Sequence, residues 1–178
     1  MKKILLSFCV VATLAACKSG GKADSEVKPS KTIKVGLAQK SDSGVSGEAT
    51  FVEQDGKVTV TANMTGLKPG IHAIHIHEKA DCSANDASSA GGHWNPLKKK
   101  HGKWGIGEYH RGDIGNFPAD QDGNGTITMT TSEWCIGCGD PAKDIIGKGL
   151  IVHEKADDFT TQPTGDAGGR VACAGIIK

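Results

Sequence analysis

An alternation of apolar and polar residues with a period of two recurs along this chain and restricts it to β-structure. The alternation is clearest over residues 58–64, where Val58, Val60, Ala62 and Met64 share one face of an extended segment. Similar short runs occupy residues 31–38, 48–53, 71–77, 125–131, 148–153 and 170–178. Asp55-Gly56 between two of the runs is typical of a hairpin turn. No segment keeps a helical period, so the sequence predicts an all-β fold: a Greek-key antiparallel β-sandwich or flattened barrel of about eight strands.

Two long stretches, residues 78–111 and 154–169, show no periodicity. Long structureless connections within a compact domain are usually functional, so we expect two long functional loops. The length of 178 residues suggests one domain. The 25 glycines and the aromatic content of 4% agree with turn-rich β-structure.

The N-terminal residues carry the features of an export signal. Residues 1–16 join a basic start to a short apolar stretch, and "LAAC" at 14–17 resembles the lipobox of bacterial lipoproteins. We therefore expect a lipoprotein signal peptide at 1–16, a lipidated Cys17 with a flexible tether at 17–31, and a folded domain at 32–178. This places the protein in the periplasm or at the cell surface, attached to a bacterial membrane only through its lipid. The alternative is ordinary signal cleavage that leaves Cys17 unmodified.

The charge of the chain gives no support for nucleic-acid binding. Lys and Arg number 21 and Asp and Glu number 20, and two of the lysines lie in the expected leader. A nucleic-acid-binding domain would need a basic stripe, so no nucleic-acid partner is expected.

The cysteines indicate disulfides. Of the six cysteines, Cys9 lies in the leader and Cys17 at the lipid site, which leaves Cys82, Cys135, Cys138 and Cys173. An even number in an exported chain favours disulfide bonds. Four cysteines allow three pairings, and the count alone does not choose among them.

The histidines form a pattern that predicts metal binding. The chain has seven, at positions 72, 75, 77, 93, 101, 110 and 153. His75 and His77 are two residues apart in a strand and project from one face, about 7 Å apart along the backbone. His72 has the opposite parity, so we expect it to pack or to support a ligand rather than to bind a metal.

The long loop adds further potential ligands. His93, His101 and His110 fall in this loop, and Asp113 follows His110 by three residues. Imidazole suits copper and zinc, and one carboxylate among histidines fits zinc. The motif "HEKAD" occurs at both His77 and His153, each at the end of an apolar strand before a long loop.

Several motifs in order give the chain a specific resemblance: "GIHAIHIHE", "GGHWNP", "KKHGKWG", "HRGDIGN", "IVHEKADD" and "GGRVACAG". Over residues 34–178 it resembles the copper/zinc superoxide dismutases, in particular the bacterial secreted branch. The resemblance implies copper held by His75, His77, His93 and His153, and zinc held by His93, His101, His110 and Asp113. It further implies that His93 bridges the metals, that Asp157 links a copper-binding to a zinc-binding histidine, and that Cys82 and Cys173 form a disulfide.

The activity that the resemblance implies is the dismutation of superoxide to O₂ and H₂O₂ by a redox-cycling copper ion beside a structural zinc. Arg170 and His93 would be the catalytic side chains: Arg170 would attract the superoxide anion, and His93 would carry a proton. The alternative is a copper- and zinc-binding lipoprotein without catalysis. Bacterial members of this family occur as monomers and as homodimers, and the sequence does not choose between them.

Three weaker signals accompany these motifs. Cys135 and Cys138 lie outside the family pattern; we expect a small extra disulfide there, with a metal or redox site as the alternatives. The lysines at 98–100 either guide the substrate or form a solvated charged run. "DQDGNG" at 120–125 resembles the start of a calcium loop, but the twelfth position is Thr131 and no helices flank it, so a hairpin turn is expected.

Overall fold

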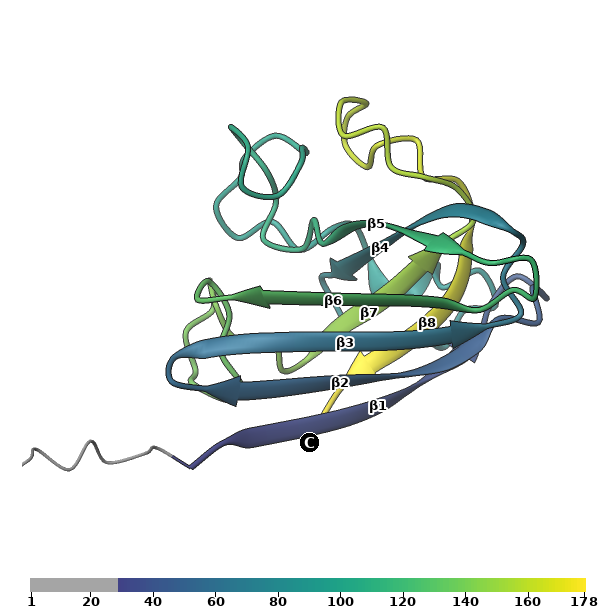
Figure 1. The fold of residues 1–178 in the computed structure, drawn as a ribbon. Coiled ribbons are helices and arrows are strands. Elements are labelled where there is room, and N and C mark those ends of the chain that lie inside the picture. Colours follow the sequence, from purple (N-terminus) through teal and green to yellow (C-terminus); the bar gives the residue numbers. More distant parts are fainter. Residues whose placement is uncertain (1–28) are drawn as a thin grey trace, which may run out of the picture.

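The computed structural model describes residues 29–178, and the expected signal peptide and Cys17 lie outside this range. Eight strands make up the domain, with one short 3₁₀ helix, η1, at Ser88–Ala90. The strands are β1 Lys31–Gln39, β2 Ser46–Gln54, β3 Lys57–Thr65, β4 Gly70–His77, β5 Gly115–Ala119, β6 Gly125–Thr131, β7 Lys148–His153 and β8 Arg170–Ile176 (Figure 1). The first strand begins at Lys31, the last residue assigned to the expected tether. Among the described residues, no helix has the length and apolar character needed to cross a membrane.

The strands close into a barrel in the order β1-β2-β3-β6-β5-β4-β7-β8. All the paired neighbours are antiparallel, and the crossings from β3 to β6 and from β4 to β7 join strands that are not consecutive in the chain. The fold class predicted from the sequence is confirmed, and the sheet takes the closed form. Closure rests on short pairings at two seams: β1 pairs with β8 through two residue pairs, and β5 with β6 through one.

The alternation in the sequence sets which face of each strand is buried. Along β3 the burial alternates, and Val58, Val60, Ala62 and Met64 are buried. On the outer face, hydroxyl pairs link β3 to β6, with Thr59 Oγ1 2.8 Å from Thr130 Oγ1. At the β2–β3 turn, Asp55 and Gly56 both have positive φ (51° and 73°), as a tight hairpin of matching twist requires.

One strand, β5, was not predicted. It has five residues, contains Pro118, and pairs with β6 through a single residue pair, Ala119 with Gly125. Its apolar pattern is too short to stand out, and proline is atypical of strand interiors. The "DQDGNG" segment forms the turn between β5 and β6, where Asp120 Oδ1 accepts the backbone N–H groups of Asp122 and Asn124.

In strand β4 both faces are buried over residues 72–77, as they are over residues 149–153 of its neighbour β7. Ile74 and Ile76 belong to the main core inside the barrel. His75 and His77 point the other way, yet they are fully buried. The loops after β4 and after β7 rise above this part of the barrel (Figure 1). A compartment therefore lies between the barrel wall and the long loops.

Two disulfides are present in the described domain. Cys82 in the loop after β4 is bonded to Cys173 in β8, 91 residues away in sequence. Cys173 packs with Ala87, Ala90 and Ile151 in a small apolar cluster beneath the loop. Cys135 is bonded to Cys138 in the loop between β6 and β7. Disulfides persist in oxidising compartments, so the pair indicates an extracellular or periplasmic protein.

Candidate metal centre

Two buried groups of potential metal ligands lie under the long loops, and they share one residue. The first contains His75, His77, His93 and His153; the second contains His93, His101, His110 and Asp113. In each group, one ligand atom per residue lies within 4.8 Å of all the others. Four-coordinate metal sites need donor atoms at this spacing. The structure thus brings together all seven residues that the sequence singled out as ligands.

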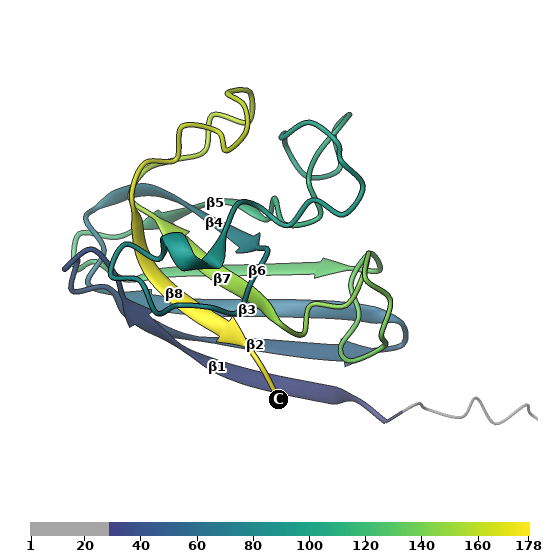
Figure 2. The same cartoon turned by 180° about the vertical axis from the view of Figure 1, so that it is seen from behind.

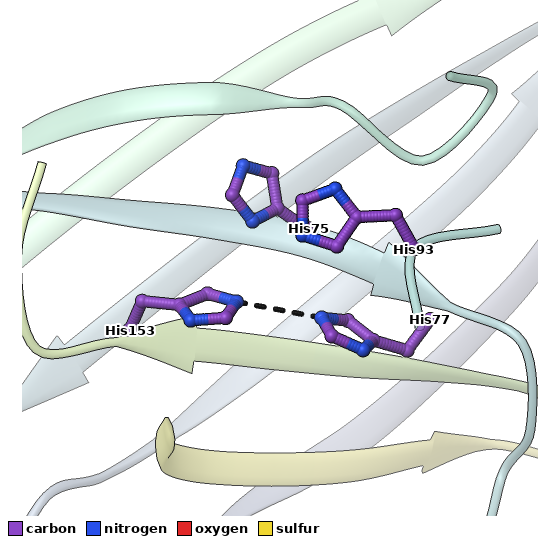
Figure 3. Close-up of side chains that lie close together, drawn as sticks. All are labelled: His75, His77, His93 and His153. Atoms are coloured by element: carbon purple, nitrogen blue, oxygen red, sulfur yellow. Dashed lines mark hydrogen bonds between the residues drawn. The ribbon is translucent and has the colours of Figure 1, made fainter. Parts of the chain in front are cut away.

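Three members of the first group project from the outer face of β4 and β7, and His93 comes from the loop after β4 (Figure 3). In the register of β4 and β7, His75 is opposite Ile151, and His77 is opposite Gly149. The pairing of β7 with β8 shifts between Val152 and His153. Such bulges redirect side chains at the ends of strands, and here His153 faces His77, with their Nε2 atoms 3.4 Å apart (Figure 3).

Close backbone contact brings the long loop to β4. Trp94 N–H donates to Ile76 O at 2.8 Å, and Ile76 N–H donates to Gly112 O at 2.9 Å. A Cβ atom at Gly112 would overlap the carbonyl oxygen of Ile76, so the approach requires glycine. Because Gly112 lies between His110 and Asp113, this contact also fixes the part of the loop that supplies the second group.

Hydrogen bonds to the outer ring nitrogens orient the imidazoles. His77 Nδ1 lies 2.9 Å from Gly91 O, and His110 Nε2 lies 3.1 Å from Lys99 O. A carbonyl oxygen only accepts, so these nitrogens carry the proton and the opposite nitrogens keep their lone pairs. Outer contacts of this kind commonly orient metal-bound histidines.

Several ring nitrogens of this centre are buried without a hydrogen-bond partner. Six side-chain atoms in residues 29–178 are buried and unpartnered, and five of them belong to this centre: His75 Nδ1, His93 Nε2, His101 Nδ1, His110 Nδ1 and His153 Nδ1. Buried polar atoms are nearly always satisfied, and each exception needs an explanation. A soft or borderline metal ion would satisfy unpartnered imidazole nitrogens of this kind, so the residues fit bound metal ions.

Burial keeps the first group neutral. Desolvation lowers the pKa of His75, and it lowers the pKa values of His77 and His153 well below 6.5. The pKa of His93 falls to about 4 through burial and the neighbouring charge of His75. Metal ligation needs deprotonated donors, so the environment favours the metal-binding form of each ring near neutral pH.

Asp113 provides the only carboxylate in the second group. Its Oδ1 lies 2.8 Å from His93 Nδ1, and its Oδ2 lies 3.0 Å from His101 Nδ1. Burial opposes ionisation of Asp113, but close contacts with His101 and His110 and the hydrogen bond with His93 outweigh it and lower the pKa of the carboxyl. Asp113 Oδ2 also accepts the backbone N–H of His110 at 2.7 Å, which closes the loop locally.

Asp157 joins the two groups. Its Oδ2 accepts from His75 Nε2 at 2.9 Å, and its Oδ1 accepts from His101 Nε2 at 2.9 Å. Burial opposes ionisation of Asp157, but the hydrogen bonds from His101 and His75 outweigh burial and lower the pKa of the carboxyl. Burial also opposes protonation of His101, yet its bonds to Asp113 and Asp157 raise its pKa to about 9.

Arg170 contacts the loop beside the first group. Its Nη1 donates to Ala87 O at 2.7 Å, and its Nη2 donates to Gly91 O at 2.8 Å. Gly91 O is also the acceptor for His77, so Arg170 is one backbone atom away from that ring. After burial and the charge of His93, the charge of Arg170 contributes to the lowered pKa of His77.

His72 stays outside both groups. Its Nδ1 lies 2.9 Å from His153 O, and its Nε2 lies 2.8 Å from Lys68 O. It therefore supports the backbone of His153, in line with the role expected from its parity. The lysines at 98–100 are exposed.

Two supporting side chains were missed from the sequence. Asn116 in β5 pairs with the backbone of Asp157 in both directions, at 2.8 Å each. Gln162 accepts from His101 N–H and donates to His101 O. Asn116 is the last residue of the "HRGDIGN" motif, which was a signal for it, but it lies in the strand that was not predicted and was given no role. Gln162 lies outside the quoted motifs, so the sequence carried no signal for it.

The structure is thus an antiparallel β-barrel with two adjoining candidate metal sites on its outer wall. The model of the copper/zinc superoxide dismutase family matches residues 45–176. The chain belongs to the copper/zinc superoxide dismutase family.

The solved structures that resemble this chain include proteins that are described in different ways. A SOD-like protein from Bacillus subtilis, solved as a double mutant with a tyrosine and a proline each changed to histidine, is 33% identical with a TM-score of 0.73; the match covers 82% of this chain and 97% of that one. The clock protein EA4 is 37% identical with a TM-score of 0.69, over 81% of this chain and 94% of that chain. Because proteins with this fold are described in different ways, the fold alone does not define an activity, and activity has to be inferred from the site residues.

Proposed function

We propose that this protein dismutes superoxide to O₂ and H₂O₂, using a copper ion in the first group and a zinc ion in the second. The observation that carries the proposal is the sharing of His93 between an all-imidazole group and a group with one carboxylate. Imidazole donors suit copper, and a carboxylate among histidines suits zinc. A bound copper ion would supply the one-electron chemistry, which zinc lacks.

His75, His77, His93 and His153 would hold copper, and His93, His101, His110 and Asp113 would hold zinc. The two ring nitrogens of His93 serve different sides, since Nδ1 faces Asp113 and Nε2 is free of hydrogen bonds. Asp157 would keep His75 and His101 in the tautomers that present their Nδ1 lone pairs inward.

Arg170 would attract the substrate. Superoxide is a small anion, and a fixed positive charge at the mouth of a narrow site raises its local concentration. Both terminal nitrogens of Arg170 are held by backbone carbonyls, so the charge has a defined place beside His77.

His93 would move one of the protons that the reaction consumes. Its Nε2 is buried and unpartnered, while Nδ1 stays beside Asp113. Nε2 is therefore the atom that can take up a proton and pass it to the peroxide product. Two superoxide ions and two protons yield one O₂ and one H₂O₂, so this transfer keeps the proton balance.

The location proposed for this activity is a bacterial envelope surface. The "LAAC" sequence supports lipidation at Cys17, and metabolic labelling with a fatty acid, with Cys17→Ser as the control, would test it. Loss of label in that variant is expected; equal labelling would contradict a lipid on Cys17.

The decisive assay compares superoxide consumption by protein loaded with copper and zinc against protein loaded with zinc alone. Activity only with copper, at one copper per chain, is expected. Stoichiometric copper without activity would instead support a non-catalytic metal-binding lipoprotein. The SOD-like and clock-protein relatives make this a meaningful alternative.

A further inference from the structure

A third group of potential ligands lies outside the histidine centre. Cys135, Cys138 and Asp144 each offer one ligand atom within 4.8 Å of the others. They belong to the loop between β6 and β7, which lies at the end of the barrel near the β2–β3 turn (Figure 2). The long loops over the histidine centre rise from another part of the barrel (Figure 2).

Asp144 holds this loop together without help from the disulfide. Its Oδ1 accepts the backbone N–H groups of Gly137 and Ile146, and its Oδ2 accepts that of Gly139. Cys135 adds two backbone bonds, donating to Lys143 O and accepting from Ile145 N–H. These hydrogen bonds do not depend on the disulfide, so the loop should keep its shape when the Cys135–Cys138 bond is reduced.

The loop is also tied to the barrel. Ile136 N–H donates to Glu53 Oε2 at 2.8 Å, and Lys31 Nζ donates to Ile136 O at 2.8 Å. Both anchors bind the backbone of Ile136, whose side chain is part of the main core. The two cysteines on either side of this anchored segment thus have limited freedom to separate.

The donor set has capacity for a metal ion. A carboxylate has about four lone-pair positions, and the three backbone donors leave one of them on Asp144 Oδ2. Two thiolates and one carboxylate oxygen are donors that zinc accepts in a tetrahedral arrangement, with water in the fourth position. Asp144, partly buried and close to both sulfurs, is the third ligand that the Cys-x-x-Cys motif lacked in the sequence.

We propose that the reduced form of this loop binds one Zn²⁺ through Cys135, Cys138 and Asp144, as a site independent of the histidine centre. A dithiol reductant would open the site: its two electrons and two protons convert the disulfide to two thiols, and the dithiol becomes a cyclic disulfide. Zinc binding then releases both thiol protons. Cys138 is exposed and open to attack by the reductant, whereas Cys173 of the other disulfide is 1% exposed.

The test measures zinc stoichiometry on the full-length protein with the histidine centre first saturated with zinc. Oxidised protein, protein reduced with a dithiol, and the reduced C135S/C138S variant are equilibrated with Zn²⁺, desalted and analysed for metal. The reduced wild type should retain one more zinc per chain than either control. Equal zinc in all three samples would overturn the proposal.

Two further measurements assign the ligands. Zinc should protect Cys135 and Cys138 of the reduced protein from alkylation; equal alkylation with and without zinc would overturn the site. Asp144→Ala should weaken the extra zinc by about tenfold or more, as the loss of a positioned metal contact does, while superoxide-dismutase activity stays unchanged. Full affinity in that variant would overturn the three-ligand site.

Discussion

Replacing Asp157 with alanine tests whether one carboxylate organises both metal groups. The variant removes the acceptor of His75 Nε2 and of His101 Nε2 together. Each ring would then be free to rotate or to change tautomer, and the Nδ1 lone pair that faces the centre would no longer be fixed. Both groups should therefore lose affinity for their metals, although neither loses a ligand.

The magnitude follows from the hydrogen bonds lost. A hydrogen bond to a charged group contributes about 1.5–3 kcal/mol, and about 1.4 kcal/mol corresponds to a tenfold change in affinity. One such bond per group predicts that each metal dissociates more readily by about ten- to a hundredfold, the range typical of contacts that orient metal-bound histidines.

The assay is competitive titration of copper and zinc against chelators of known affinity. Asp158→Ala is the control, because it removes the same charge one residue away and contacts Thr160 and Thr161 rather than a histidine. Metal affinities in Asp157→Ala equal to those of this control would refute the reasoning.

Four other predictions follow from the same structure. Arg170→Glu should keep its metals but slow superoxide turnover by about tenfold or more and flatten its salt dependence; unchanged turnover at low ionic strength would rule out the guiding role. Gly112→Ala should displace the long loop from β4 and lower zinc content, measured by metal analysis, because its Cβ would overlap the strand backbone; full zinc content would show that the approach is not so tight. In metal-free protein, burial and a neighbouring histidine lower the pKa of His93 from the ordinary 6.5 to about 4. The unfolded chain then binds more protons at His93 between these values, so the contribution of His93 to stability should fall by about 3 kcal/mol from pH 6.5 to 4; urea denaturation should show it as a shallower pH dependence in His93→Gln than in the wild type. Replacing Cys82 and Cys173 with serine should lower the free energy of unfolding by about 4–5 kcal/mol, since their bond closes a loop of 91 residues; a loss below about 1 kcal/mol in denaturant titrations would contradict this.

The sequence predicted the barrel well where side chains alternate along a strand. Residues 58–64 show the period in every position, and the structure buries the apolar set. Strand β5 lacks such a signal because its five residues include Pro118 and its position depends on pairing with β4 rather than on its own composition. A local sequence pattern predicts those strands whose own side chains alternate. A strand such as β5 forms because it pairs with neighbouring strands, and the local pattern does not show this.

The candidate site was accessible from the sequence for a chemical reason. Few residue types bind transition metals, so histidines and an aspartate at strand ends and in one loop stand out. The contacts that orient them are backbone carbonyls, such as Gly91 O and Lys99 O, and common polar residues such as Asn116. These groups occur throughout any chain and gain meaning only from their positions in space. The same holds for Asp144, which is nine residues from Cys135 and meets it only after folding.

The carbonyl oxygen of Gly91 accepts from both His77 and Arg170. Its loop is fastened to β8 by the Cys82–Cys173 bond. A displacement of that one peptide group would turn the ring and shift the guanidinium in the same movement, so the two cannot be adjusted separately. Because the disulfide joins this loop to the strand that carries Arg170, any strain on that bond would reach the ring and the guanidinium together.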